Sequence, residues 1–124
     1  MLPYKTFLLS SALLGFTAVG IGAFAAHYLK TRLSTEMAAV FEVGVRYHMY
    51  HALALLGLGL MFQLGQPKEF VWAGYCFISG ICLFSGSLYA LALTGTRILG
   101  AITPLGGVLL LLGWAYMAWG LKSL

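Results

Sequence analysis

Residues 6–29 read TFLLSSALLGFTAVGIGAFAAHYL, a run of 24 uncharged residues between Lys5 and Lys30. Three further runs without a charged side chain lie at residues 47–67, 70–96 and 98–121. A helix needs about 20 apolar residues to cross a hydrocarbon core of about 30 Å, so each run is long enough for one crossing. The spacing of the charges therefore predicts four membrane-spanning helices.

The composition of the chain points to the same environment. Of its 124 residues, 61% are hydrophobic and 8% are charged, with seven basic and three acidic side chains. Soluble domains have about a quarter of their residues charged. The composition therefore excludes a soluble globular domain and a disordered chain. It also excludes a nucleic-acid-binding protein, because seven scattered basic residues form no extended basic surface.

We predict one all-α transmembrane domain over residues 1–124, a four-helix bundle with both termini on one side of the membrane. The expected spans are residues 6–29, 44–65 and 70–94, followed by 98–121 or 104–121. The two versions of the last span differ in the role of Pro104. Either Thr103 caps a helix that begins at Pro104, with residues 98–102 as a loop or re-entrant segment, or Pro104 kinks a longer helix.

The connection after the first span carries a helix-start signal. Ser34 is a suitable N-cap, and Glu36 in the first turn interacts favourably with the positive end of the helix dipole. Helix can continue unbroken from residue 35 to residue 64, with its first turns in the interface or beyond it. We predict a short interfacial helix that leads into the second span, with a bend near Gly44.

The N-terminal run permits a second interpretation. A basic residue, an apolar run and the small-x-small sequence at residues 23–25 resemble a signal peptide with its cleavage site. We prefer a retained first span, because residues 6–29 are longer than a usual signal-peptide core and carry small residues at helix-packing spacing.

Small residues recur at such spacing in three of the predicted spans. In lipid, close backbone approach through small residues supplies much of the association between helices. In the last span, glycines repeat every seven residues, the interval that keeps one face against a neighbour in a left-handed bundle. We expect helix contacts at Gly15, Gly22, Gly86, Gly106, Gly113 and Gly120.

Most polar side chains are expected at one end of the bundle, the histidine-bearing face. Two of the connections between antiparallel spans, the first and the third, emerge on this side. The candidate site for a polar ligand, a lipid headgroup or a partner consists of His27, Glu42, Arg46, Tyr47, His48, Tyr50, His51, Tyr89, Arg97 and Thr103.

Glu42 and Arg46 form an i, i+4 pair in the favourable order. One interpretation is an interfacial anchor, in which the Arg46 side chain extends to the lipid headgroups. The other is a functional polar pocket, because ionisable residues inside membrane segments are functional candidates. The sequence leaves both open.

The three histidines raise the question of a cofactor. His48 and His51 at i, i+3, with His27 opposite them, are candidate ligands for a metal or a haem. The tetrahedral zinc set is incomplete and no carboxylate is placed to orient either ring, so we predict interfacial hydrogen bonding and no metal or cofactor. Cys76 and Cys82 lie six residues apart on one helix, about 9 Å, which is too far for a disulfide.

Several motifs, taken together, resemble one family of membrane proteins. They are GAFAAH at residues 22–27, Phe41-Glu42 with Gly44, Arg46-Tyr47, His51, FSGSLY at 84–89, TPLGG at 103–107 and Gly113-Trp114. Their order and spacing resemble the domain of unknown function 423 and transmembrane protein 256 family over nearly the whole chain. Ala25 departs from the family pattern, which usually shows Gly there. The resemblance implies a small multi-helix protein, in bacteria of the inner membrane, and supplies no catalytic residues.

The sequence favours a non-enzymatic multi-pass membrane protein that acts by helix-mediated assembly, as a homo-oligomer or with a membrane protein partner. No nucleophile triad, phosphate loop or pair of catalytic carboxylates can be assembled from the chain. The alternative is a small oligomeric transporter or channel, proton-coupled through His48, His51 or Glu42. A membrane redox enzyme using haem is a third hypothesis. Four basic residues on the histidine-bearing face against three on the other do not determine the orientation.

Overall fold

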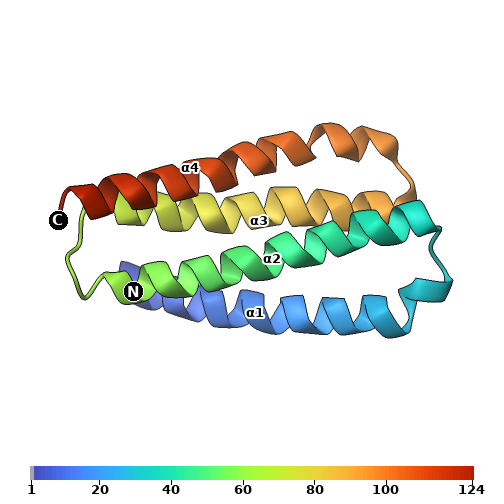
Figure 1. Cartoon of the computed structure of the whole chain (residues 1–124), viewed down its shortest axis with the longest axis horizontal. Coiled ribbons are helices and arrows are strands. Elements are labelled where there is room, and N and C mark those ends of the chain that lie inside the picture. The colour runs from blue at the N-terminus through green and yellow to red at the C-terminus, as the bar shows by residue number, and fades with distance from the viewer. Residues whose placement is uncertain (1) are drawn as a thin grey trace.

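The computed structural model describes residues 2–124, and within them the chain is entirely helical apart from short connections. Four long α-helices are joined by tight turns, two of which contain a 3-10 helix (Figure 1). The elements are α1 (Pro3–His27), η1 (Leu29–Thr31), α2 (Thr35–Met61), α3 (Lys68–Thr94), η2 (Arg97–Ala101) and α4 (Thr103–Lys122). The all-α prediction is confirmed.

Helix α2 begins where the sequence predicts. The Ser34 hydroxyl accepts a hydrogen bond from the Met37 amide at 3.1 Å, and Glu36 lies in the first turn. The helix then continues through Gly44 without interruption for 27 residues, about 40 Å at 1.5 Å per residue. The expected interfacial helix is therefore not a separate element, because nothing breaks the helical hydrogen bonds between it and the second span.

The start of α4 settles how Pro104 is accommodated. Pro104 lies in the first turn, where a missing N–H breaks no helical hydrogen bond, and η2 precedes the helix in place of the expected loop. Thr103 is the first helical residue and not the cap, since Ile102 occupies the cap position. The Thr103 hydroxyl instead lies 2.6 Å from the Ser87 hydroxyl of α3.

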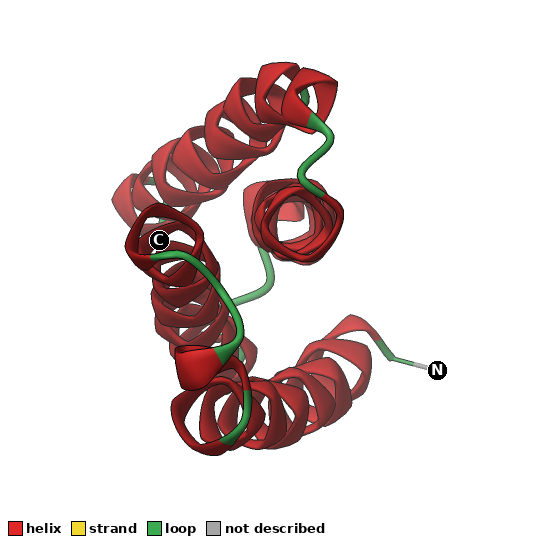
Figure 2. Cartoon of the chain, turned by 90° about the vertical axis from the view of Figure 1, so that its right-hand side faces the viewer, coloured by secondary structure: helices red, strands yellow, loops and turns green. Residues whose placement is uncertain are grey.

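The helices are antiparallel in sequence order, but they do not close into a square bundle. Extensive contacts join α1 to α2, α2 to α3 and α3 to α4. Within the described chain, α1 and α4 make no extensive contact and lie on opposite outer sides of the α2–α3 pair, as both views show (Figures 1 and 2). One face of α2 is consequently left without a helix against it.

Glycines of α4 allow this helix to approach α3 closely. A Cβ atom at Gly113 would lie 2.6 Å from the Phe77 ring, and one at Gly120 would lie 2.6 Å from the Phe70 ring. At Gly106 it would lie 2.7 Å from the Phe84 Cα atom. The phenylalanines of α3 therefore fill the space that the missing side chains leave.

Two of the glycines that we expected at helix contacts, Gly15 and Gly86, do not face a neighbouring helix. Nothing stands within 4 Å of a Cβ atom built on Gly15 or Gly86, so within one chain neither mediates a helix contact. Both belong to stripes of small residues in the sequence, and such a stripe does not reveal which of its members faces a neighbouring helix. Gly22 is intermediate, with the Val45 side chain 3.1 Å from its Cβ position.

Three segments of the described chain are long and apolar enough to cross a membrane: Pro3–His27, Lys68–Thr94 and Arg97–Lys122. Helix α2 is as long as α3, but it carries Glu42, Arg46, His48 and His51. Most of the polar chemistry of the bundle thus resides on one helix.

Candidate functional site

A cavity of about 460 Å³ lies between the C-terminal part of α1 and the N-terminal part of α2. Its walls are mostly small or aliphatic, which leaves room between two helices that are otherwise in contact. The wall residues are Gly22, Ala25, Ala26, Leu29, Leu33, Ala38, Phe41 and Val45. Ala25 and Ala26 bring two methyl-sized side chains from α1 to this lining.

Three charged side chains complete the lining of this cavity: Lys30, Glu42 and Arg46. A guanidinium nitrogen of Arg46 donates to Glu42 Oε1 at 2.7 Å, and the two side chains remain 56% and 62% exposed. Among residues 2–124, Lys30 forms no salt bridge. The cavity therefore has apolar walls, a paired acid and base, and one further cation.

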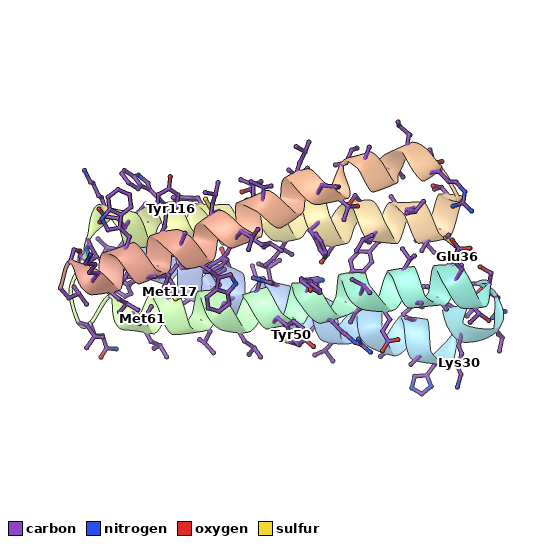
Figure 3. The ribbon with its side chains drawn as sticks, turned by 45° about the horizontal axis from the view of Figure 1, so that its top comes forward. Lys30, Glu36, Tyr50, Met61, Tyr116 and Met117 are labelled. Carbon is purple, nitrogen blue, oxygen red and sulfur yellow. The ribbon has the colours of Figure 1, made fainter. Side chains whose placement is uncertain are left out.

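The cavity lies toward one end of the molecule. Figure 3 shows Lys30 and Glu36 at the end where α1 passes into α2, whereas Met61, Tyr116 and Met117 lie at the opposite end. Arg97 of η2 reaches the first of these ends and approaches Glu36 at 3.8 Å, with both side chains largely exposed. We call the end where α1 passes into α2 the cavity end, and the opposite end, which holds the termini, the terminal end.

His48 links three helices. Its Nε2 atom lies 3.1 Å from Thr17 Oγ1 on α1, and its Nδ1 atom lies 2.9 Å from the Tyr89 hydroxyl on α3. The Thr17 hydroxyl also donates to the Leu14 carbonyl at 3.0 Å. A hydrogen-bonded chain therefore runs across α3, α2 and α1, with the imidazole at its centre.

The contacts of His51 fix its tautomer. The indole N–H of Trp114 donates to His51 Nε2 at 3.1 Å, so Nε2 carries no proton. The proton then resides on Nδ1, which lies 2.8 Å from the Tyr47 carbonyl oxygen. His51 is a neutral imidazole with both nitrogens satisfied, which suits a buried position in lipid.

The prediction that all three histidines lie at one end of the bundle is wrong. His48 follows Thr35 by thirteen residues, about 20 Å along a helix of about 40 Å, so both α2 histidines lie near mid-length. His27 is exposed and lies ten residues, or about 15 Å, beyond Thr17, the partner of His48. Within the described residues, no group of three histidine, cysteine or carboxylate side chains is placed to hold a metal ion.

The remaining predicted residues are divided between two places. Tyr47, Tyr50 and His51 line a shallow groove of about 400 Å³ with Phe84 and residues of α4, Trp114 among them. Figure 3 shows Tyr50 on α2 near the middle of the molecule. Arg97 and Thr103 lie near the cavity end but do not line the cavity.

Sequence reasoning missed Thr17 and Trp114 as the partners of the two buried histidines. Trp114 is 63 residues from His51, and nothing local in the sequence connects them. In the sequence, Lys30 marks only the end of the first uncharged run. Its position one turn beyond a small-residue stripe was the available signal for the cavity.

Fold and site together define a multi-pass membrane protein with an amphiphilic cavity at one end of a helical bundle. The family described as "Protein of unknown function (DUF423)" matches residues 21–107, a range that includes every residue of the cavity lining. The chain belongs to this family.

Similar proteins come from several bacteria. The chain is 50% identical to a UPF0382 membrane protein of Staphylococcus epidermidis over 111 residues, which cover 89% of each chain. It is 44% identical to the UPF0382 membrane protein YwdK of Bacillus subtilis over 111 residues, 89% of this chain and 90% of the relative. It is 43% identical to the UPF0382 inner membrane protein YgdD of Escherichia coli over 114 residues, 91% of this chain and 86% of the relative.

A search of the solved structures found no match. The sequence relatives and the three apolar helices agree, and the chain is a multi-pass protein of the cell membrane.

Proposed function

We propose that this protein binds an anionic amphiphile, such as a phospholipid with a negatively charged headgroup, in the cavity between α1 and α2. The observation that carries the proposal is the lining itself, in which apolar walls meet two cations and only one carboxylate. We assign the protein no reaction, and binding in the membrane is its proposed role.

The cavity supports an amphiphile because its two parts match the two parts of a lipid. Leu29, Phe41 and Val45 present apolar surface that suits a hydrocarbon chain. Lys30 and Arg46 present N–H donors that suit a phosphate or carboxylate, and charge-assisted hydrogen bonds to such groups are among the strongest.

The cations favour an anionic ligand over a zwitterionic one. Glu42 already neutralises one positive charge through Arg46, and a headgroup with its own cation would compete for the same carboxylate. A headgroup with net negative charge pairs with Lys30 and leaves the pair of Glu42 and Arg46 in place.

The alternative of a proton-coupled transporter draws on Glu42, which is paired with Arg46, or on His48 and His51, which lie buried near the middle of the bundle. Each of their four ring nitrogens already has a partner within the chain. A proton arriving at His51 Nε2 would place two donors, the imidazole N–H and the Trp114 indole N–H, against each other. These contacts favour a structural role for the histidines, and binding remains our proposal.

Filling the cavity tests the proposal. Ala38→Leu adds bulk on the α2 wall, and Ala12→Leu adds the same bulk at an exposed site of α1 outside the cavity. Native mass spectrometry of the purified protein with phosphatidylglycerol measures the fraction of lipid-bound protein. We expect Ala38→Leu to weaken binding by about tenfold and Ala12→Leu to leave it unchanged. Equal binding by both variants contradicts the proposal.

A further inference from the structure

Aromatic rings gather on the surface of α3 and α4 at the terminal end, where Figure 3 shows Tyr116. The Trp72 ring meets the rings of Tyr116 and Trp119 edge to face, with centroids 5.3 and 6.4 Å away. Both tryptophans remain exposed, and the Lys68 ammonium lies 5.3 Å from the centre of the Trp72 ring. We call Lys68, Trp72, Tyr116 and Trp119 the terminal band.

A smaller group of the same kind lies at the cavity end, on the last turns of α1 and the residues that follow. The exposed rings of Phe24 and Tyr28 are stacked with their centroids 5.0 Å apart. The Arg32 guanidinium carbon lies 3.7 Å from the centre of the Tyr28 ring, and Arg32 also donates to the Tyr28 carbonyl at 3.1 Å. We call Phe24, Tyr28 and Arg32 the cavity band. Each band therefore combines exposed aromatic rings with a cation over one of them.

The side chains of both bands suit the boundary between hydrocarbon and water. Tryptophan and tyrosine are enriched at membrane interfaces, because each joins an apolar ring to a polar N–H or O–H group. Lysine and arginine place their methylene stems against apolar surface and their charges among the headgroups. Since α1 and α4 lie on opposite outer sides of the bundle, the two bands also face different sides of the molecule. Such bands at opposite ends are expected of a protein that meets both surfaces of a bilayer.

The distance between the bands matches the thickness of one hydrocarbon core. Phe7 of α1 packs against Gly74 of α3, two residues from Trp72, so Phe7 marks the level of the terminal band on α1. Tyr28 follows Phe7 by 21 residues, about 32 Å at 1.5 Å per residue. A hydrocarbon core is about 30 Å thick. The two bands are therefore far enough apart to lie at its two boundaries.

We propose that the terminal band and the cavity band contact the headgroup layers of opposite leaflets, with the hydrocarbon core between them. The partner of both surfaces is the lipid bilayer itself. Lys30, two residues beyond Tyr28, then lies among the headgroups, whereas Phe16, nine residues from Phe7, lies near the bilayer centre. This placement does not rest on amphiphile binding, because none of the band residues lines the cavity.

Tryptophan fluorescence tests the terminal band, since the chain has three tryptophans. Replacing two of them by phenylalanine leaves one fluorophore in vesicles of phosphatidylcholine brominated at a chosen chain position. Trp114 is the matched control: its exposure, 45%, lies between the 40% of Trp72 and the 55% of Trp119. It is five residues, about 7 Å, deeper on α4 than Trp119. We expect bromines near the headgroup to quench Trp72 and Trp119 about twofold more than bromines near the chain end, and Trp114 to show the reverse order. Trp72 or Trp119 at the depth of Trp114, or deeper, overturns the proposal.

A nitroxide label tests the cavity band and leaves every tryptophan in place. In a background of Cys76→Ala and Cys82→Ala, the label is attached to Tyr28→Cys or, as the control on the same helix, to Phe16→Cys. Both native rings are exposed, so each label points away from the core. Electron paramagnetic resonance measures collisions with oxygen, which concentrates in hydrocarbon, and with a water-soluble nickel complex. We expect the ratio of oxygen to nickel collisions to be about tenfold higher at residue 16 than at residue 28, which are about 18 Å apart. Equal ratios, or a higher ratio at residue 28, overturn the proposal.

Discussion

The two ends of the bundle are packed differently. At the end that holds the termini, Phe7 and Phe70 are completely buried, and glycines on the facing helices receive their rings. At the cavity end, the buried hydrophobic cluster comprises Leu29, Phe41 and Ala92, beside a cavity of about 460 Å³. Both ends belong to the same four helices, so helix formation alone does not account for the difference.

The comparison separates stability from binding. Large rings set into glycine surfaces give dense contact and little space for a ligand. Small side chains on both α1 and α2 leave space, and charged groups beside it supply recognition. We therefore expect substitutions at the terminal end to affect unfolding and those at the cavity end to affect ligand binding.

The largest contrast is expected from removing a buried ring at each end. Phe70→Ala leaves a void beneath Gly120 and beside Phe62, and we expect it to lower the free energy of unfolding by about 4 kcal/mol. Phe41→Ala enlarges an existing cavity, and we expect a loss of about 2 kcal/mol. Reversible unfolding in mixed micelles measures both. Equal losses would show that the two ends do not differ in packing.

The next contrast adds one methyl group at each end. Gly120→Ala, at the terminal end, places a Cβ atom 2.6 Å from the Phe70 ring, and we expect the free energy of unfolding to fall by about 2 kcal/mol from overpacking. Gly22→Ala meets the tip of Val45 at 3.1 Å beside the cavity, where that side chain has room to shift. The gain in helix propensity from glycine to alanine then cancels the strain. We therefore expect the unfolding free energy of Gly22→Ala to stay within about 0.5 kcal/mol of that of the parent protein. If Gly22→Ala proves less stable than the variant at the terminal end, the proposed difference in packing is wrong.

Between the two ends, the His48 contacts contribute less. Thr17→Val and Tyr89→Phe each remove one hydrogen bond to the His48 imidazole. We expect each substitution to lower the free energy of unfolding by about 1 kcal/mol. A double-mutant cycle with His48→Phe isolates the coupling of each pair. If the coupling energies are zero, the chain of hydrogen bonds does not join the three helices.

The smallest effect is expected at the exposed ion pair. Glu36 and Arg97 are separated by 3.8 Å, and their side chains are 66% and 78% exposed. Glu36→Gln should leave the unfolding free energy unchanged within about 0.5 kcal/mol, because exposed pairs contribute little. A larger loss in the same micelle assay would indicate that this contact is shielded from solvent in the membrane.

The helical fold was readable from the sequence because its causes are local. Uncharged runs mark long helices, Ser34 caps α2, and Pro104 is confined to a first turn. The glycines of α4 that face α3 are also predictable from the sequence, because their spacing of seven residues places them on one face of the helix. Gly15 and Gly86 carry no such repeat, and their orientation depends on where a neighbouring helix lies.

The arrangement of the helices and the details of the site depend on contacts that are distant in sequence. The position of α1 and α4 on opposite sides of the central pair follows from packing along whole helices. The pairings of Thr17 with His48 and of Trp114 with His51 follow from that arrangement. The cavity likewise needs two helices to be placed before its lining residues can be identified.

The central claim is that the cavity end binds an anionic amphiphile and the terminal end does not. The most direct test compares phosphatidylglycerol and phosphatidylcholine binding in Lys30→Gln and Lys122→Gln, which remove one lysine from each end. Native mass spectrometry should show phosphatidylglycerol binding about five- to tenfold weaker in Lys30→Gln and unchanged in Lys122→Gln. Phosphatidylcholine binding should be insensitive to both. Equal losses of phosphatidylglycerol in the two variants would show general attraction to charge and contradict a specific site.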